Sequence, residues 1–290
     1  MTVREAMAEG KRTLKSPCFN AQITTPDLDA SLLLAKAMQL SREELITRGD
    51  EPLTPDAYKE FLKLLGRRTG GECVAYILGK KEFRGLDFIV NESVLVPRPD
   101  TELLVSTISQ KWGNSSGTRK EPKRLLDLCT GSGAIAISLK HDMPEIGVWA
   151  ADISAEALET AGANARQHQM AKSIHFYQGH LFKALPAGLT FHAIVSNPPY
   201  IPSDEIARLS PEVQMEPRLA LDGGKDGLDI IREIITRAPD YLEPDGVLLL
   251  EAAPEQMKSI SAALEKSHFI NIKTYNDLSQ MERVIEGTMP

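Results

Sequence analysis

The chain has 290 residues, of which 42% are hydrophobic and 25% charged, and its formal net charge is -7. This composition is that of a globular protein able to bury its own core, in one or two domains. The acidic balance argues against extensive binding of DNA or RNA, which needs clustered basic residues. We therefore expect a protein or small-molecule partner, and no direct nucleic-acid partner.

The three cysteines, Cys18, Cys73 and Cys129, are widely spaced and form no CxxC pair. Neither a disulfide framework nor a zinc site is predicted, and we expect no metal and a reducing cytoplasm. No apolar run approaches the roughly 18 residues needed to span a bilayer. Because Glu5 and Glu9 lie in the first segment, it is unlike an acid-poor targeting peptide. We expect a cytoplasmic protein with no membrane partner.

Residues 1–79 have helical periodicity throughout and are predicted to form a small helical bundle. In the segment LTPDAYKEFLKLLGRR, Thr54 can cap a helix whose first residue is Pro55. Gly66 is expected near the end of that helix. No catalytic group stands out in this region.

Residues 80–96 mix β-branched and aromatic residues with turn formers, which predicts a β-hairpin linking two domains. In residues 97–290, short apolar runs alternate with helical stretches. The predicted strands are RLLDL, VWAADI, SIHFYQ, HAIVS and GVLLLEA, and the predicted helices start at Ala134, Ala155 and Pro254, with one around Ile230. This alternation predicts an α/β fold with a mainly parallel sheet covered on both faces.

A glycine-containing turn follows the first of these strands in the segment LLDLCTGSGAIAIS. Gly131 and Gly133 let the chain turn tightly and bring backbone N–H groups against a ligand. The spacing is not the dinucleotide pattern G-x-G-x-x-G, and a compact strand-to-helix connection is the alternative. At this edge of a sheet, the turn favours a nucleotide-like ligand.

Asp152 ends the next strand, about twenty residues after the glycines, where an acid can bind both hydroxyls of a ribose. Together with the glycine turn, it indicates an adenosine. The alternative is that Asp152 caps the following helix, a role that Ser154 could also fill.

The tetrad Asn197-Pro198-Pro199-Tyr200 follows the apolar strand HAIVS, where open α/β sheets bind ligands. Two prolines fix φ and donate no hydrogen bond, so the loop can present the Asn197 carboxamide and the Pro198 carbonyl as rigid acceptors. A turn without a ligand is the alternative.

The loop suits an amide nitrogen as its target, although such a nitrogen is a poor nucleophile. Its lone pair is delocalised into the carbonyl. Two acceptors that bond both N–H hydrogens, with Tyr200 packed over the planar group, would hold the nitrogen in line with a sulfonium methyl group. The proton can be lost to solvent, so no strong base is required.

Longer segments extend these motifs across nearly the whole chain. They are AYILGKKEFRGLDFIVNESVLVPRPDTELLV from Ala75, DLCTGSGAIAIS from Asp127, VSNPPYIP from Val195, EPRLALDGGKDGLDIIREI from Glu216 and DLSQMERVIEG from Asp277. In them the chain resembles the release factor glutamine methyltransferases (HemK/PrmC family). NPPY is shared with other amino-group methyltransferases, whereas VPRPDTE together with EPRLAL is more specific.

The resemblance implies a class I S-adenosylmethionine-dependent methyltransferase fold, which is Rossmann-like, with seven strands of which the seventh is antiparallel. It implies an N-terminal helical bundle, residues 1–79, that docks the protein substrate, a hairpin linker, residues 80–96, and a catalytic domain, residues 97–290. The implied reaction transfers a methyl group from S-adenosyl-L-methionine to N5 of the glutamine in the GGQ motif of class I peptide chain release factors. This methylation would tune translation termination, and we expect a monomer.

The resemblance also implies roles for individual residues. The cofactor site would consist of Cys129, Thr130, Gly131, Ser132, Gly133, Asp152, Leu181 and Asn197. Asn197, Pro198 and Tyr200 would be catalytic, and with Pro199 they would hold the glutamine. Arg98 and Glu102 would open a helix over the cofactor, while Glu216 and Arg218 would brace the NPPY loop; surface salt bridges are the alternative for these four.

Two positions depart from the family pattern. Where relatives often have an acid followed by a bulky residue, this chain has Gly179-His180-Leu181-Phe182, which weakens the assignment of Leu181 to the adenine. His180 is expected at the surface. Met215 replaces a common tyrosine and could fill the same apolar gap.

Three other functions compete with this interpretation. A glutamine methyltransferase of a large-subunit ribosomal protein would share NPPY but depart from PRPDTE. An adenine-N6 DNA methyltransferase would require a basic target-recognition region, which an acidic chain does not offer. A non-catalytic cofactor-binding protein is disfavoured by the intact tetrad.

Overall fold

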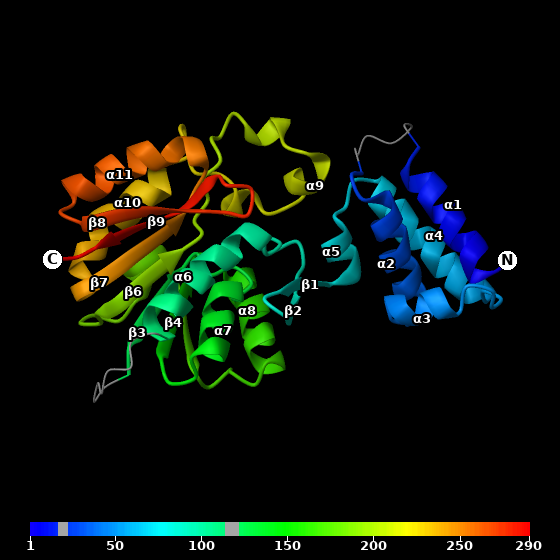
Figure 1. Ribbon diagram of the computed structural model, residues 1–290, viewed down its shortest axis with the longest axis horizontal. Helices are drawn as coiled ribbons and strands as arrows, with labels where there is room; N and C mark the ends of the chain where they lie inside the picture. The colour runs from blue at the N-terminus through cyan, green and yellow to red at the C-terminus, as the bar shows by residue number, and fades with distance from the viewer. Residues whose placement is uncertain (17–22, 114–121) are drawn as a thin grey trace. The chain divides into compact units, whose positions relative to one another are not determined.

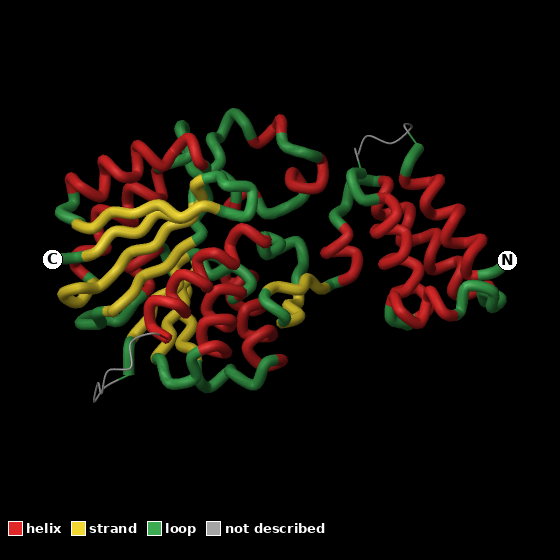
Figure 2. The backbone as a smooth tube through the Cα atoms, viewed as in Figure 1, coloured by secondary structure: helices red, strands yellow, loops and turns green. Residues whose placement is uncertain are grey.

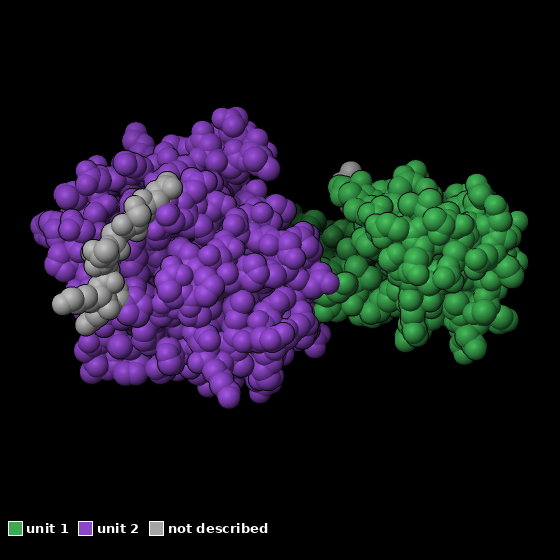
Figure 3. Space-filling model, turned by 60° about the horizontal axis from the view of Figure 1, so that its bottom comes forward, with its two compact units in different colours: residues 1–80, 208–216 green, residues 81–207, 217–290 purple. Residues whose placement is uncertain are grey.

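A computed structural model describes residues 1–16, 23–113 and 122–290, so Cys18 lies outside the described residues. The described chain divides into two compact units (Figure 3). Unit 1 consists of residues 1–80 and 208–216, and unit 2 of residues 81–207 and 217–290. None of the described helices is both long and apolar enough to cross a membrane.

Unit 1 is a helical bundle around an apolar core that includes Leu33, Leu34, Phe61 and Leu64. Its helices are α1 (Val3–Leu14), α2 (Pro26–Met38), α3 (Arg42–Thr47), α4 (Pro55–Thr69), α5 (Val74–Leu78) and the short α9 (Pro211–Gln214), shown in Figure 1. The Thr54 side chain accepts a hydrogen bond from Ala57 N at 3.3 Å, as expected for the cap of α4.

Helix α4 ends at Thr69, three residues beyond Gly66, near which the sequence predicts its end. The last turn is held by Arg68, which is buried and donates a hydrogen bond from Nε to the buried Asp29 carboxylate of α2 at 2.7 Å. Arg68 also donates to Glu212 of α9 at 2.5 Å. This ion-pair cluster joins the bundle to a segment far along the chain, which explains why residues 208–216 belong to unit 1.

A two-stranded sheet of β1 (Lys80–Phe83) and β2 (Leu86–Ile89) follows the bundle. The connection is the dipeptide Arg84-Gly85, in which both residues have positive φ. Two such residues form the type of turn that matches the twist of a hairpin. The chain then enters a 3-10 turn, η1 (Pro99–Thr101), that leads directly into α6 (Glu102–Gly113).

The central element of unit 2 is a seven-stranded sheet with the order β5-β4-β3-β6-β7-β9-β8. Its strands are β3 (Arg124–Leu128), β4 (Gly147–Asp152), β5 (Ile174–Gln178), β6 (Phe191–Ser196), β7 (Leu242–Glu251), β8 (Ile270–Asn276) and β9 (Glu282–Thr288). Strands β3 to β7 pair in parallel, and β9 is antiparallel to both of its neighbours. The predicted α/β methyltransferase fold, with one antiparallel strand, is confirmed.

Helices cover both faces of this sheet (Figures 1 and 2). They are α7 (Ala134–Asp142), α8 (Ala155–Gln167), α10 (Asp229–Arg237) and α11 (Met257–Lys266), with α6 beside α7. Successive strand residues enter opposite cores: Leu125 packs with α6 and α7, and Leu126 with α10 and α11. Because side chains alternate along a strand, a continuous apolar run fills both cores at once.

Candidate active site

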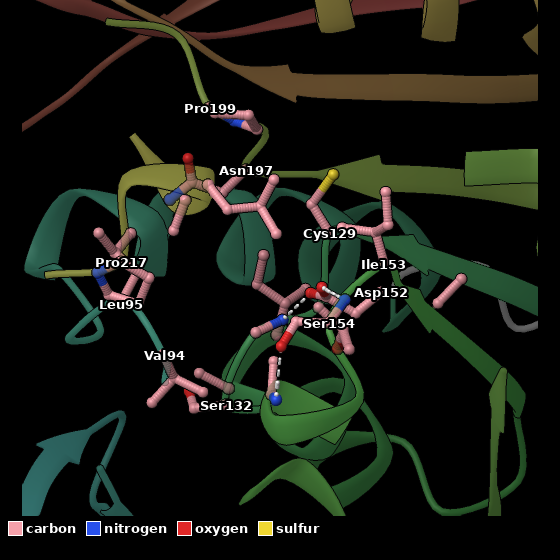
Figure 4. A pocket seen from close by; sticks show the side chains of 18 of the residues that line it. Val94, Leu95, Cys129, Ser132, Asp152, Ile153, Ser154, Asn197, Pro199 and Pro217 are labelled. Carbon is pink, nitrogen blue, oxygen red and sulfur yellow. Dashed lines mark hydrogen bonds between the residues drawn. The ribbon is translucent and has the colours of Figure 1, made fainter. Parts of the chain in front are cut away.

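A pocket of about 280 Å³ lies at the carboxyl ends of β3, β4 and β6 (Figure 4). The strand order reverses here, because β4 lies on one side of β3 and β6 on the other. Open α/β sheets bind ligands at such a point. Of the residues singled out in the sequence, those that line the pocket are Arg98, Cys129, Thr130, Gly131, Ser132, Asp152, His180, Leu181, Asn197 and Pro199, whereas Gly133, Pro198 and Tyr200 are not among the lining residues.

The glycine turn forms the floor between β3 and α7. Gly131 and Gly133 have φ values of 55° and 81°, and Cys129 also has a positive φ of 57°. A Cβ on Gly133 would lie 3.0 Å from the Ile137 side chain and 3.2 Å from Ala161, so a larger residue would push α7 and α8 apart. The turn therefore requires glycine for both conformation and close helix packing.

Asp152 is held in place by backbone groups. Its Oδ2 accepts a hydrogen bond from Gly131 N at 2.8 Å, and its Oδ1 accepts one from Ser154 N at 3.0 Å (Figure 4). Burial raises the pKa of the carboxyl despite these bonds. The cap of α8 is Ser154, which accepts from Ala157 N at 3.0 Å, so Asp152 is not needed for that role.

The NPPY loop leaves the end of β6, and its first side chain enters the pocket. Asn197 donates a hydrogen bond from Nδ2 to the Thr101 hydroxyl at 3.0 Å. Farther along, the Tyr200 carbonyl accepts from Gln256 Nε2 at 2.9 Å. Burial raises the pKa of the Tyr200 phenol far above its usual range, so this side chain stays neutral.

The last residue of the EPRLAL segment and the residues that follow it support the loop. Ile201 N donates to Leu221 O, and Gly223 N donates to Ile201 O, both at 2.9 Å. A Cβ on Gly227 would lie 2.1 Å from the Tyr200 carbonyl oxygen, which shows how closely the two backbones approach. The NPPY loop is thus clamped mainly by backbone contacts.

The four charged residues that the resemblance singled out are held differently. Arg218 is exposed and pairs with Asp222 at 2.9 Å, and Asp222 in turn accepts a hydrogen bond from the Ser203 hydroxyl at 2.6 Å. Glu216 is buried and belongs to unit 1. Glu102 accepts a long hydrogen bond from a backbone N–H, that of Arg84, at 3.4 Å. Arg98 lines the pocket.

The two positions that depart from the family pattern lie in different units. Leu181 is buried, has a positive φ of 48° and lines the pocket together with His180. His180 is partly exposed, and its Nε2 lies 2.8 Å from the Glu233 carboxylate. Met215 is about half exposed and belongs to unit 1.

Two buried carboxyl groups near the pocket were not assigned a role from the sequence. Asp127 lies under the glycine turn, where its Oδ2 accepts from the Thr130 hydroxyl at 2.6 Å and from Ala136 N at 3.2 Å. Glu251 ends β7 beside the NPPY loop. Burial raises the pKa of both groups to about 7. An acid at the end of the apolar run GVLLLE was the signal that could have found Glu251.

Among the described residues, no group of three or more His, Cys, Asp or Glu side chains is arranged to hold a metal ion. The pocket is lined by apolar side chains, by the glycine turn, and by polar groups that include Asp152, Asn197 and Arg98. This lining suits a ligand with an apolar face and hydroxyl groups.

Comparisons with known proteins match both parts of the chain. A family profile described as PrmC N-terminal domain matches residues 5–79, and one described as Methyltransferase small domain matches residues 99–209. The release factor glutamine methyltransferase of Burkholderia pseudomallei is 39% identical over 91% of this chain and 92% of its own length. That of Moorella thermoacetica is 40% identical over 90% of this chain and 88% of its own.

Solved structures share the fold at low sequence identity. The 16S rRNA N2 G1207 methyltransferase of T. thermophilus, solved with AdoMet and guanosine, has a TM-score of 0.53 and 16% identity. The match covers 73% of this chain and 50% of that one. At this identity the likeness concerns the fold alone.

Proposed function

The chain belongs to the release factor glutamine methyltransferase family and is a protein-glutamine methyltransferase, and we propose that its acceptor is the glutamine of the GGQ motif in class I peptide chain release factors. In this proposal a methyl group passes from S-adenosyl-L-methionine to the side-chain nitrogen N5, which tunes translation termination. The observation that carries it is the Asn197 carboxamide, held at a strand end in the same pocket as Asp152 and the glycine turn.

The pocket fits S-adenosylmethionine, which supplies a methyl group on a positively charged sulfur. Both Asp152 oxygens accept backbone hydrogen bonds, and a carboxylate has enough lone pairs to accept ribose hydroxyls as well. Cys129, Thr130, Gly131, Ser132 and Gly133 would follow the cofactor backbone. Leu181 would pack against the adenine, since it is buried at the pocket wall.

Asn197 and Pro198 would bind the glutamine amide through its two N–H groups. Because Nδ2 of Asn197 donates a hydrogen bond to Thr101, Oδ1 is the end of the carboxamide that remains for a substrate. The Pro198 carbonyl is the second acceptor in a loop that two prolines and the Gln256 contact keep rigid. Pro199 and Tyr200 would confine the planar amide, and two fixed acceptors favour positive charge on its nitrogen.

The remaining parts of the proposal concern the whole chain. Residues 1–79 would dock the protein substrate, residues 80–96 would link this bundle to the catalytic domain, and residues 97–290 would carry the reaction. Residues 208–216 join unit 1, so the docking unit would include part of the chain that follows NPPY. The enzyme would act as a monomer in the cytoplasm, where release factors work.

Mass spectrometry of a release factor after incubation with enzyme and S-adenosylmethionine tests the acceptor directly. We expect one added methyl group on the GGQ glutamine and none on a Gln→Glu release factor, because a carboxylate lacks the two N–H donors. Purified large-subunit ribosomal proteins and an adenine-containing DNA duplex serve as parallel acceptors. An added methyl group on a ribosomal protein alone would overturn the release-factor assignment. An added methyl group on DNA alone would overturn the amide chemistry.

A further inference from the structure

Asn197 is the first member of a chain of hydrogen bonds that runs away from the pocket. Its Nδ2 donates a hydrogen bond to Thr101 Oγ1 at 3.0 Å, and the Thr101 hydroxyl is hydrogen-bonded to the Glu251 carboxylate. Thr101 and Glu251 are both buried. Strands β6 and β7 pair so that Ser196 lies opposite Leu250, which brings the next residues, Asn197 and Glu251, to one edge of the sheet.

The direction of these bonds follows from the number of hydrogens. A threonine hydroxyl has one hydrogen, and an ionised carboxylate can only accept. When Thr101 donates to Glu251, its oxygen can only accept a second bond, and the group of Asn197 that faces it must be the NH₂. In the flipped amide, Oδ1 of Asn197 would face the Thr101 oxygen with no hydrogen between them.

We propose that Thr101 and Glu251 are positioning residues that orient the Asn197 carboxamide with Oδ1 toward the substrate amide. This inference rests on the proposed function, because the correct orientation matters only for a substrate that presents N–H donors. A flipped Asn197 would oppose donors to donors and lose the acceptor on which the amide nitrogen depends.

Packing alone does not account for Glu251. Its side chain is 1% exposed, and Oε2 has no hydrogen-bond partner in the described chain. A buried carboxyl with an unsatisfied oxygen is destabilising relative to an apolar residue of similar size. The charged and titratable groups that act on it are Arg98, Asp100, Tyr200 and Arg283.

These groups leave Glu251 able to ionise near neutral pH, because its pKa is raised to about 7. Arg283 and Arg98 lower the pKa of Glu251, which burial raises most and Asp100 raises further. The nearby Arg283 is itself held by Asp277 at 3.3 Å and by Asp100 at 3.7 Å. Glu251 therefore contributes little to packing, but its carboxylate can accept a hydrogen bond from Thr101.

Two substitutions of Thr101 separate shape from hydrogen bonding. Thr101→Val keeps the side-chain shape and removes the hydroxyl, whereas Thr101→Ser keeps the hydroxyl. The matched control is Thr107→Val in α6, a buried threonine whose hydroxyl bonds the Leu103 carbonyl at 2.8 Å. Glu251→Gln completes the set, because an amide can donate to Thr101 and reverse the direction of the bonds.

Steady-state methyl transfer to a release factor is the first measurement. We expect Thr101→Val and Glu251→Gln to lower kcat by about tenfold or more, with KM for the release factor and Kd for S-adenosylmethionine changed less than about twofold. Thr101→Ser should retain kcat within about threefold, and Thr107→Val should match the wild type. Wild-type kcat in Thr101→Val, or a loss confined to KM, would overturn the positioning role.

Nuclear magnetic resonance of the Asn197 side-chain amide tests the relay without any substrate. Thr101→Val and Glu251→Gln should shift the two Asn197 NH₂ proton signals, and Thr107→Val should not. Unchanged Asn197 signals in Thr101→Val would overturn the relay. Absence of methyl transfer by the wild type to every glutamine acceptor would overturn the proposed function instead, so the two failures are distinguishable.

Discussion

The two ends of the pocket hold their key side chains by different means. Asp152 is held by two backbone N–H groups. That of Ser154 comes from its own turn, and that of Gly131 from the neighbouring turn after β3. Asn197 is held by side chains, because Thr101 precedes α6 and Glu251 ends β7. The first arrangement uses backbone groups at the ends of the paired strands β3 and β4. The second depends on segments that meet only in the folded sheet, and its failure should affect turnover before binding.

Removal of Asn197 is the strongest test of this difference. Asn197→Ala should lower kcat by about 100-fold or more, because a fixed acceptor is lost where charge develops on the amide nitrogen. Docking of the release factor should change little. Kinetics at saturating cofactor measure the effect, with Asn276→Ala, an exposed asparagine of β8, as control. Turnover equal to the wild type would contradict the proposed chemistry of the NPPY loop.

Loss of Asp152 should affect binding rather than turnover. Asp152→Ala removes the acceptor for two ribose hydroxyls and leaves the N–H groups of Gly131 and Ser154 unpaired. We expect the free energy of S-adenosylmethionine binding to become less favourable by about 1 to 3 kcal/mol. Calorimetry with the isolated enzyme gives the value. Glu145→Ala, an exposed acid before β4, should bind as the wild type does. An unchanged Kd in a folded Asp152→Ala variant would exclude this acid from the cofactor site.

The pH dependence of turnover should report Glu251. Burial raises its pKa to about 7. Below that pH its carboxyl is protonated and can donate to Thr101, which frees the threonine hydrogen to turn toward Asn197. We therefore expect kcat to rise by about threefold to tenfold as the pH increases through 7, measured with saturating substrates. The Glu251→Gln variant should have a lower kcat and should lack this rise. The same pH profile in both enzymes would show that the ionisation of Glu251 does not control turnover.

The smallest effect on turnover is expected at Asp127, although its effect on stability should be clear. Burial raises its folded-state pKa from 3.8 to about 7, so the folded protein keeps a proton that the unfolded chain loses. The stability that this group contributes is present below about pH 4 and is lost as the pH rises through 7. Between these limits the free energy of unfolding should fall with pH.

Asp127→Asn removes this titration. Relative to the wild type, the variant should gain about 2 to 3 kcal/mol in unfolding free energy between pH 5 and about pH 8. Urea denaturation at several pH values measures the difference. A stability gap that stays constant with pH would show that Asp127 does not titrate in this range.

Much of the architecture follows from local pattern. The apolar runs marked the strands β3 to β7 but not β8 and β9, and the two glycines marked the turn that follows β3. The cap at Thr54 and the acid at the end of β4 were also predicted from the residues beside them. These features depend on backbone conformation and on hydrogen bonds within a few residues or between adjacent strand ends, so nearby sequence is sufficient to specify them.

Other features depended on tertiary structure. The sequence placed the end of α4 near Gly66, and the helix ends at Thr69. The cluster of Arg68 with Asp29 and Glu212, which joins residues 208–216 to the bundle, was not predicted. Hydrogen bonds between side chains of distant segments compensate for buried charge only after the segments meet. The periodicity of apolar residues in the sequence does not predict them.

By itself, the sequence determined the α/β fold, the glycine turn, the acid at the end of β4 and the NPPY tetrad. It did not determine which way the Asn197 carboxamide points. The two ends of that group are nearly equal in size, and only a partner with a defined hydrogen direction distinguishes them. That partner, Thr101, is directed by Glu251, and the register of β6 and β7 brings these groups together.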